Sequence, residues 1–220
     1  MLRRREGWIG PDGREDPDHG EPRLWRARLE AMSRVAAALA RFDSGAERGI
    51  VLDVGSGGGW AARYVGDADV IAVDLLAAGA GSAALHLRAD MRSLPLRDHT
   101  VDAALYVASL HYAPLTDSIR EAARVLRPGG ALIALDSPMY HDRGAQARAA
   151  RRSAEYYASA GFPELAEHYH PIDTGELRAA LAARDVEVIR LDPGTGAEGW
   201  WQRLGRQRRP SFLLARTIPG

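Results

Sequence analysis

Short apolar runs alternate with helical patterns along most of the chain. Seven runs rich in β-branched and aliphatic residues have the length of strands. They are Ile50–Val54, Val70–Asp74, Ala84–Ala89, Val101–Val107, Ala131–Asp136, Val186–Leu191 and Ser211–Ala215. Apolar residues three and four positions apart predict helices at Trp60–Val65, Leu115–Leu126 and Thr174–Ala183, and an earlier one from Pro22 to about Phe42. This alternation predicts an α/β fold, a doubly wound and mostly parallel sheet with helices on both faces.

Two segments lack a periodic pattern. Residues 1–22 are rich in Gly, Pro, Asp and Arg, which predicts a flexible N-terminal arm ahead of a single domain at 23–220. The connection from Pro193 to Arg209 contains Trp200 and Trp201 and is unusually long. Its tryptophans and arginines suit stacking on nucleic acid, but we favour a packed loop because the chain has no net charge.

Composition excludes several functional classes. Basic and acidic residues both number 29, so nothing in the overall charge calls for nucleic acid or an anionic membrane. The absence of cysteine excludes disulfides, thiolate metal sites and cysteine nucleophiles. No secretory signal precedes Pro11, and no stretch approaches the roughly 18 apolar residues of a membrane helix. We therefore expect a cytoplasmic monomer or homodimer, and the exclusive use of arginine as the basic residue suggests a GC-rich, bacterial genome.

The stretch VLDVGSGGGW at 51–60 carries the strongest functional signal. It joins the first predicted strand to the first crossover helix, where an open α/β sheet forms its ligand crevice. Glycines at this turn let a nucleotide lie on the backbone, next to the N–H groups of a helix N-terminus. Asp74 ends the next strand, 19 residues after Gly55, and an acid about 20 residues past the glycines is placed to bind ribose hydroxyls.

The residues around this turn discriminate between nucleotides. A dinucleotide-binding turn needs a third glycine at the position of Trp60, and the bulky indole argues against NAD. A P-loop needs a lysine, and the chain has none. An NAD(P)-dependent oxidoreductase remains the rival enzyme class.

The pattern Asp53-x-Gly55-x-Gly57-x-Gly59 resembles the class I S-adenosylmethionine (SAM)-dependent methyltransferases of the small-molecule type. Further motifs resemble the same family in order and spacing over residues 45–140. They are AlaAspMet at 89–91, LeuProLeu at 94–96, ValAspAlaAlaLeu at 101–105, AlaSerLeuHisTyr at 108–112 and ArgValLeuArgProGlyGly at 124–130. The resemblance implies a seven-stranded sheet with an antiparallel last strand, and we expect a helical lid with the acceptor pocket at about 138–185.

The resemblance also implies a cofactor site. Asp74 matches the family's ribose-binding acid, Asp90 the acid that meets the adenine amino group, and Met91 the residue that packs on the adenine ring. The full set implied for SAM and its product S-adenosylhomocysteine (SAH) is Asp53, Gly55, Ser56, Gly57, Gly59, Asp74, Leu75, Asp90, Met91 and Ser109.

The sequence signals for the methyl acceptor are less specific than those for the cofactor. The methyl carbon of SAM is already electrophilic, so positioning a nucleophile supplies much of the catalysis and a base is optional. His111, at the edge of the fourth predicted strand, is the first candidate base for a hydroxyl or phenol, and His141 is the second. We place four tyrosines in the substrate pocket: Tyr112, Tyr140, Tyr156 and Tyr157.

The sequence also allows other interpretations of these residues and of the whole chain. His168, His170 and Asp173 lack the spacing of a metal site, and we expect none. We expect instead that this aromatic segment, which includes Tyr169, lines or covers the acceptor pocket together with Tyr156, Tyr157 and Phe162. The leading hypothesis is methyl transfer from SAM to an O, N or C nucleophile of a small molecule. A protein that binds SAM or a partner without catalysis is the alternative from another class, because fold and cofactor do not determine the acceptor.

Overall fold

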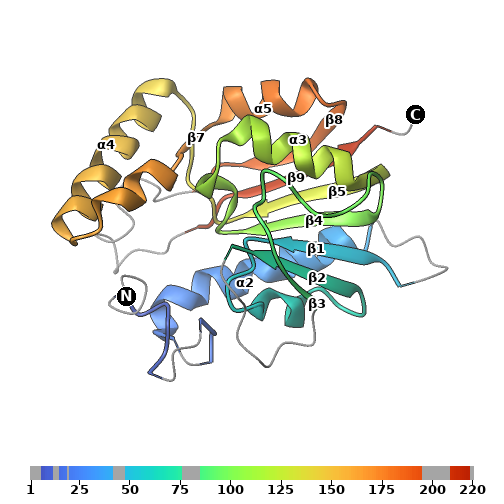
Figure 1. Cartoon of the computed structure of the whole chain (residues 1–220), viewed down its shortest axis with the longest axis horizontal. Coiled ribbons are helices and arrows are strands. Elements are labelled where there is room, and N and C mark those ends of the chain that lie inside the picture. The colour runs from blue at the N-terminus through green and yellow to red at the C-terminus, as the bar shows by residue number, and fades with distance from the viewer. Residues whose placement is uncertain are drawn as a thin grey trace.

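The central sheet has seven strands. We analysed a computed structural model, which describes residues 6–11, 15–18, 20–41, 48–75, 85–194 and 209–218. The strands are β1 (Ile50–Val54), β2 (Asp69–Asp74), β3 (Leu85–Arg88), β4 (Val101–Val107), β5 (Leu126–Leu135), β8 (Val186–Asp192) and β9 (Phe212–Thr217). Their order in the sheet is β3-β2-β1-β4-β5-β9-β8 (Figure 1).

The strand directions confirm the predicted fold class. β1 to β5 pair in parallel, and β9 is antiparallel to both of its neighbours, β5 and β8. Parallel neighbours end at the same edge, so the ends of β1, β2, β4 and β5 bring their following loops together there.

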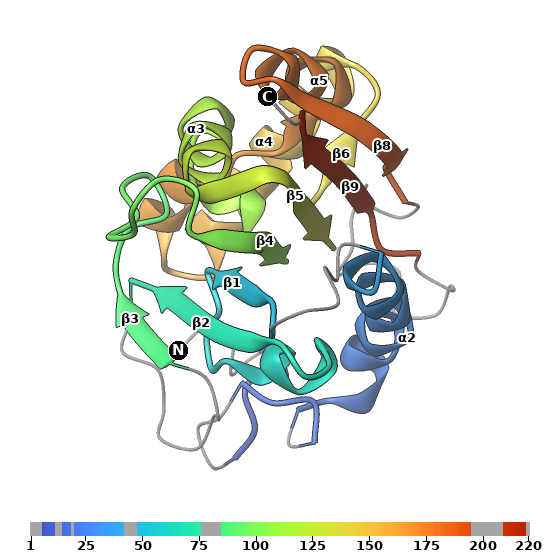
Figure 2. The ribbon, with the colours of Figure 1, turned by 90° about the vertical axis from the view of Figure 1, so that its right-hand side faces the viewer.

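Helices cover both faces of the sheet (Figure 2). The alternating side chains of the central strands divide into two cores. Leu52 and Leu132 belong to the core under α3 (Leu115–Val125) and α5 (Thr174–Ala182). Val51 and Ile133 belong to the core under α2 (Pro22–Leu39) and the short 3-10 helix η1 (Trp60–Tyr64). Because both faces of these strands are buried, they read as continuous apolar runs in the sequence.

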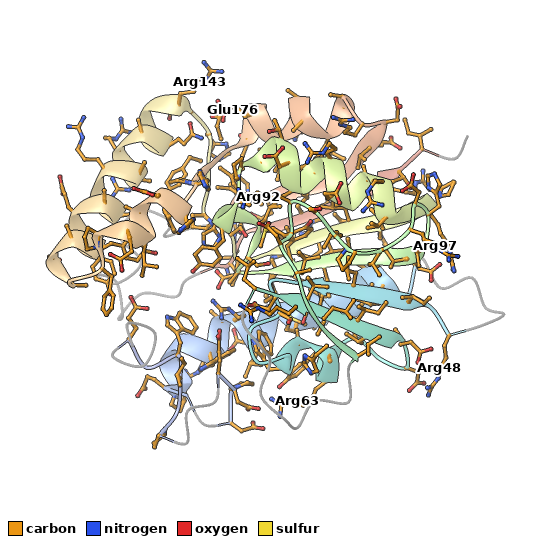
Figure 3. All side chains as sticks on the ribbon, in the orientation of Figure 1. Arg48, Arg63, Arg92, Arg97, Arg143 and Glu176 are labelled. Atoms are coloured by element: carbon orange, nitrogen blue, oxygen red, sulfur yellow. The ribbon has the colours of Figure 1, made fainter. Side chains whose placement is uncertain are left out.

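A smaller unit extends from the end of β5 to α5. It contains β6 (Met139–Tyr140), α4 (Arg143–Ser159), the 3-10 helix η3 (Pro163–His168) and β7 (Ile172–Asp173), and β6 pairs with β7. Figure 1 shows α4 to the side of the sheet. At the junction of α4 and α5, the Arg143 Nη2 lies 3.4 Å from the Glu176 Oε1 (Figure 3). The sequence predicted helices in this insertion, but not their bounds.

Several expected bounds differ from the observed ones. The strand expected at Ala131 already begins at Leu126. The expected helix at Trp60 is a single 3-10 segment whose preceding residue, Gly59, has a left-handed backbone. Phe42, Ala84 and the segment with Trp200 and Trp201 lie outside the described residues.

The described parts of the N-terminal arm pack against the domain. Trp8 is buried, and its ring meets that of Trp25 edge-on at 5.5 Å. The flexibility of residues 1–22, and the division into arm, domain and insertion, stay predictions. No helix in the described part of the chain combines the length and apolar character needed to cross a membrane.

Candidate active site

Gly55 closes the turn after β1 in a conformation that only glycine adopts readily. Its φ is 69°, in the left-handed region, and its N–H donates to the Val73 carbonyl oxygen at 2.8 Å. A Cβ at Gly55 would lie 2.6 Å from the Ser109 Cβ and 3.4 Å from the Met91 Cε. The missing side chain therefore lets the turn approach residues that follow β3 and β4, and three predicted cofactor residues meet here.

Asp74 ties the end of β2 to the glycine turn. Its Oδ2 accepts a hydrogen bond of 2.8 Å from the N–H of Gly57, whose φ is 55°. Asp74 and the turn therefore form one unit, although 17 residues separate them in the sequence. Its ribose-binding role stays a prediction. Leu75, the next residue, is exposed.

Asp53 is a buried acid at the end of β1. Only 2% of its surface is exposed, and within the described parts of the chain its Oδ2 has no hydrogen-bond partner. Burial raises the pKa of Asp53 to about 7, and the charges of Asp74 and Glu15 add to the rise. An acid in such a place is stabilised by a positively charged or hydrogen-bond-donating ligand. Ser56 lies beside it, buried, with its Oγ also lacking a hydrogen-bond partner among the described residues.

Asp90 forms an ion pair that the sequence did not predict. Its Oδ2 lies 2.6 Å from the Arg92 Nη2, and its Oδ1 accepts from the Arg92 backbone N–H at 2.8 Å. Hydrogen bonds from Arg92 lower the pKa of Asp90. Figure 3 labels Arg92 in the loop that follows β3. The predicted contact of Asp90 with an adenine amino group is not tested by this geometry.

Trp60 fills the position where a dinucleotide turn has its third glycine. The indole is buried, and its ring lies edge-on to Trp25 at 4.9 Å and to Tyr64 at 5.8 Å. The close helix–strand approach of a dinucleotide turn is therefore replaced by an aromatic core. This packing argues against NAD, because a dinucleotide-binding turn needs a glycine at the position of this buried indole.

His111 lies on η2 (Leu110–Tyr112), at the end of β4. It is buried, its Nδ1 lies 3.3 Å from the Ser137 Oγ, and its carbonyl oxygen accepts from the His170 N–H at 2.8 Å. The ring contacts Tyr112 at 4.2 Å and Tyr169 at 5.1 Å. His141, the second candidate base, is instead exposed directly after β6.

Tyrosines surround His111 from several elements. Burial raises the pKa of Tyr169, and the nearby phenols of Tyr140, Tyr112 and Tyr157 add to the rise. Tyr157 stacks edge-on to Tyr169 at 6.0 Å, and Tyr156 lies 5.6 Å from Tyr157. Predicted pocket residues thus come together with Tyr169, which belongs to the aromatic segment 168–170 that the sequence predicted at the acceptor pocket.

A buried ion pair lies next to the His111 cluster, at the carboxyl end of β5. Arg28 of α2 reaches Asp136, just past β5, with its Nη2 2.8 Å from the Asp136 Oδ2 and both side chains almost fully buried. Asp136 has a φ of 60° and directly precedes Ser137, the partner of His111. The sequence contained a signal that Arg28 is buried, because Arg28 lies three residues after Trp25 on the apolar stripe of its helix.

Asp173, considered above as a metal ligand, has a structural role instead. Asp173 caps α5, accepting from the N–H groups of Gly175 and Glu176 at 2.9 Å. Within the described ranges no three His, Cys, Asp or Glu side chains are grouped as metal ligands.

The strand order, the glycine turn and the acids at the ends of β1 and β2 define the class I SAM-dependent methyltransferase fold. The sequence matches the family described as "Methyltransferase domain" over residues 52–134. This range runs from β1 to β5 and contains the glycine turn, Asp74 and His111. Residues 52–134 therefore resemble a methyltransferase domain, and the described chain has the fold of the class I SAM-dependent methyltransferases.

Solved structures show the same fold at low sequence identity. A Galdieria sulphuraria protein provisionally named sarcosine dimethylglycine methyltransferase is 15% identical, with a TM-score of 0.66 over 96% of this chain and 92% of its own. A geranyl diphosphate methyltransferase in complex with GPP and sinefungin is 17% identical, with a TM-score of 0.60 over 84% of this chain and 78% of its own. A SAM-dependent methyltransferase from Mesorhizobium loti is 20% identical, with a TM-score of 0.57 over 84% of this chain and 99% of its own. No curated protein sequence matches the chain.

Proposed function

We propose that the protein transfers a methyl group from SAM to an O, N or C nucleophile of a small-molecule acceptor. The proposal rests chiefly on one observation: a glycine turn with no room for a side chain at Gly55, flanked by Asp74 and by Asp53, whose buried Oδ2 has no hydrogen-bond partner among the described residues. A cradle without side chains, next to a buried carboxylate of this kind, suits a ligand that carries both hydroxyl and cationic groups.

The residues that would hold SAM lie at the carboxyl ends of four parallel strands, β1 to β4, at one edge of the sheet. Asp74 would bind the ribose, Asp90 and Met91 the adenine, and the turn at 55–59 the methionine part, with Ser109 closing the turn from β4. SAM would supply an electrophilic methyl carbon on a sulfonium. The sinefungin in the geranyl diphosphate methyltransferase, a SAM analogue, supports a cofactor site of this kind.

On the acceptor side, the protein's task is to position a nucleophile and, for a hydroxyl or phenol, to remove its proton. Ser137 holds one ring nitrogen of His111, which orients the ring for such a transfer. The tyrosine rings around it would pack on an acceptor and keep water away. The smaller unit with α4 would act as the lid, in a protein that works in the cytoplasm as a monomer or homodimer without nucleic acid.

A labelled-methyl assay tests the proposal. The protein is incubated with methyl-labelled SAM and a panel of small phenols, alcohols, amines and carbon acids, and both labelled product and SAH are measured. We expect SAH to form with at least one acceptor class and in proportion to labelled product. SAM bound without transfer to any of the classes would instead support the non-catalytic alternative.

A further inference from the structure

The described parts of the N-terminal arm, Glu6–Pro11 and Glu15–Asp18, lie against the cofactor side of the domain. Arg63 of η1 lies 2.9 Å from the Asp16 Oδ1 and 2.9 Å from the Asp18 Oδ2. Figure 2 shows the arm, in blue, passing beside the teal ribbon of η1, and Figure 3 labels Arg63. One arginine therefore attaches this stretch to the element that directly follows the glycine turn.

Glu15 is the residue of the arm that touches the glycine turn. A Cβ at Gly57 would lie 2.9 Å from the Glu15 Oε2, and a Cβ at Gly58 would lie 3.0 Å from the Glu15 carbonyl oxygen. A side chain at Gly57 would push the Glu15 carboxylate aside, and one at Gly58 would press against the backbone of the arm. The run of glycines therefore makes room for a segment of this chain as well as for a ligand.

Glu15 brings a third carboxylate to this turn. Its charge and that of Asp74 both add to the effect of burial in raising the pKa of Asp53. Asp53 is 2% exposed, and its Oδ2 has no hydrogen-bond partner within the described residues. The charges of Asp74 and Glu15 thus disfavour the charged form of this buried acid, and a cationic ligand beside it favours that form.

The other end of the arm reaches the acceptor side. Tyr156 of α4 donates a hydrogen bond from its phenol to the Glu6 carboxylate, and Trp8 packs on Trp25 of α2. The Arg28 guanidinium lies over the Trp8 ring at 4.2 Å, and Arg28 in turn pairs with Asp136. The arm thus contacts the glycine turn, α2 and α4, the elements that enclose the candidate site.

We propose that the arm covers the cofactor site and that Glu15 is a cofactor-positioning residue, a third carboxylate facing the positively charged methionine end of SAM. This proposal rests on the proposed function, because it needs SAM as the ligand. It goes further in assigning a role to a segment outside the methyltransferase domain match. It also predicts that the site distinguishes SAM from SAH, since SAM carries the additional positive charge of the sulfonium.

Titration calorimetry with SAM and SAH tests the proposal on the full chain. We expect Glu15→Gln to weaken SAM binding about tenfold or more, the scale of a lost interaction with a charged group, and SAH binding by less. Glu21→Gln is the matched control, because Glu21 is an exposed acid at the start of α2 whose side chain makes no capping bond. The control should stay within about twofold of the wild type. Without ligand, thermal unfolding should be unchanged in Glu21→Gln and should not shift to lower temperature in Glu15→Gln, because removing the Glu15 charge relieves its repulsion of Asp53.

Limited trypsin digestion gives a second measurement. SAM should slow cleavage within residues 1–22 of the wild type and of Glu21→Gln, but much less in Glu15→Gln. Wild-type affinity in Glu15→Gln would overturn the proposal, and tighter binding would overturn it by showing that Glu15 competes with the cofactor. A wild type that binds neither SAM nor SAH would instead contradict the proposed function.

Discussion

The two halves of the candidate site are built in different ways. The cofactor half uses backbone: Gly55 and Gly57 have positive φ values, and the Gly57 N–H is held by Asp74. The acceptor half uses side chains from η2, β6, α4 and η3, with His111 and Tyr169 at its centre. A site made from backbone needs particular residue types at short spacing and is therefore visible in a sequence. A site made from side chains on distant elements is less visible: the sequence offers candidate residues for it but not the contacts between them.

The difference also concerns electrostatics. The cofactor half gathers acids around a buried oxygen of Asp53, whereas His111 and its tyrosines form an aromatic cluster in which burial raises the pKa of Tyr169. We therefore expect the cofactor half to respond to pH and ligand charge. The acceptor half should respond to packing.

Breaking the ion pair under the acceptor half should have the largest effect. Arg28→Met leaves Asp136 buried without its cation, which should lower the free energy of unfolding by about 3–5 kcal/mol. Urea denaturation measures this loss. The double variant Arg28→Met/Asp136→Asn should recover much of it, since Asn tolerates the φ of 60°. A loss below about 1 kcal/mol in the single variant would mean that the pair does not support this edge.

Asp53→Asn should reveal the electrostatic strain of the cofactor half. The pKa of Asp53 is raised from 3.8 to about 7, so the folded state binds this proton more tightly than the unfolded chain. Wild-type stability therefore falls as the pH rises through that window and is level above it. Without ligand, the variant should be more stable than the wild type by roughly 2–4 kcal/mol at pH 8, and by less at pH 5. Urea denaturation at the two pH values checks this, and an equal difference at both would contradict a raised pKa.

Gly55→Ala tests whether the turn is a backbone cradle. The added Cβ meets Ser109, so SAH affinity should fall about 100-fold, or roughly 2.7 kcal/mol. Gly66→Ala is the matched control. Gly66 has a similar φ of 75°, but a Cβ there has nothing within 4 Å among the described residues. Calorimetry should find wild-type affinity in the control, and an equal loss in both variants would show backbone strain alone to be responsible.

Asp74→Ala should weaken SAH binding by about 1–3 kcal/mol, the value of hydrogen bonds to a charged acceptor. Asp69→Ala, at the opposite end of the same strand and exposed, provides the comparison. The same calorimetric titration measures both variants. Unchanged affinity in Asp74→Ala would remove this residue from ribose binding.

His111→Asn should separate the halves most clearly. SAH affinity should stay within about twofold of the wild type, because His111 belongs to the aromatic cluster and not to the glycine turn. Turnover of an acceptor found with the labelled-methyl assay should fall sharply if His111 is the base. Equal turnover would show that positioning suffices, and weakened SAH binding would contradict the separation.

The sequence predicted the parts of the molecule that depend on local rules. Buried parallel strands appear as apolar runs, so the seven strands were located, and the glycine turn was visible through its letters. The start of β5 was placed less well, because it was expected at Ala131 and the strand already begins at Leu126. Residues 126–130 include Arg127, Pro128 and two glycines, which are typical of a turn in the sequence.

The rest depends on contacts between distant residues. The pair of Arg28 and Asp136 is separated by 108 positions, and nothing in either local pattern names the partner. Glu15 lies in a stretch whose composition predicts a mobile arm, yet the described arm residues contact the glycine turn. Tyr169 enters the aromatic cluster only because η3 folds back toward His111.

The central claim is that the glycine turn and its acids form a SAM site. Titration calorimetry of the full chain with SAM, SAH and NAD tests it most directly. The structure predicts saturable binding of SAM and SAH at one site and no heat from NAD, whose turn would need a glycine in place of the buried Trp60. Binding of NAD with no response to SAM or SAH would contradict it.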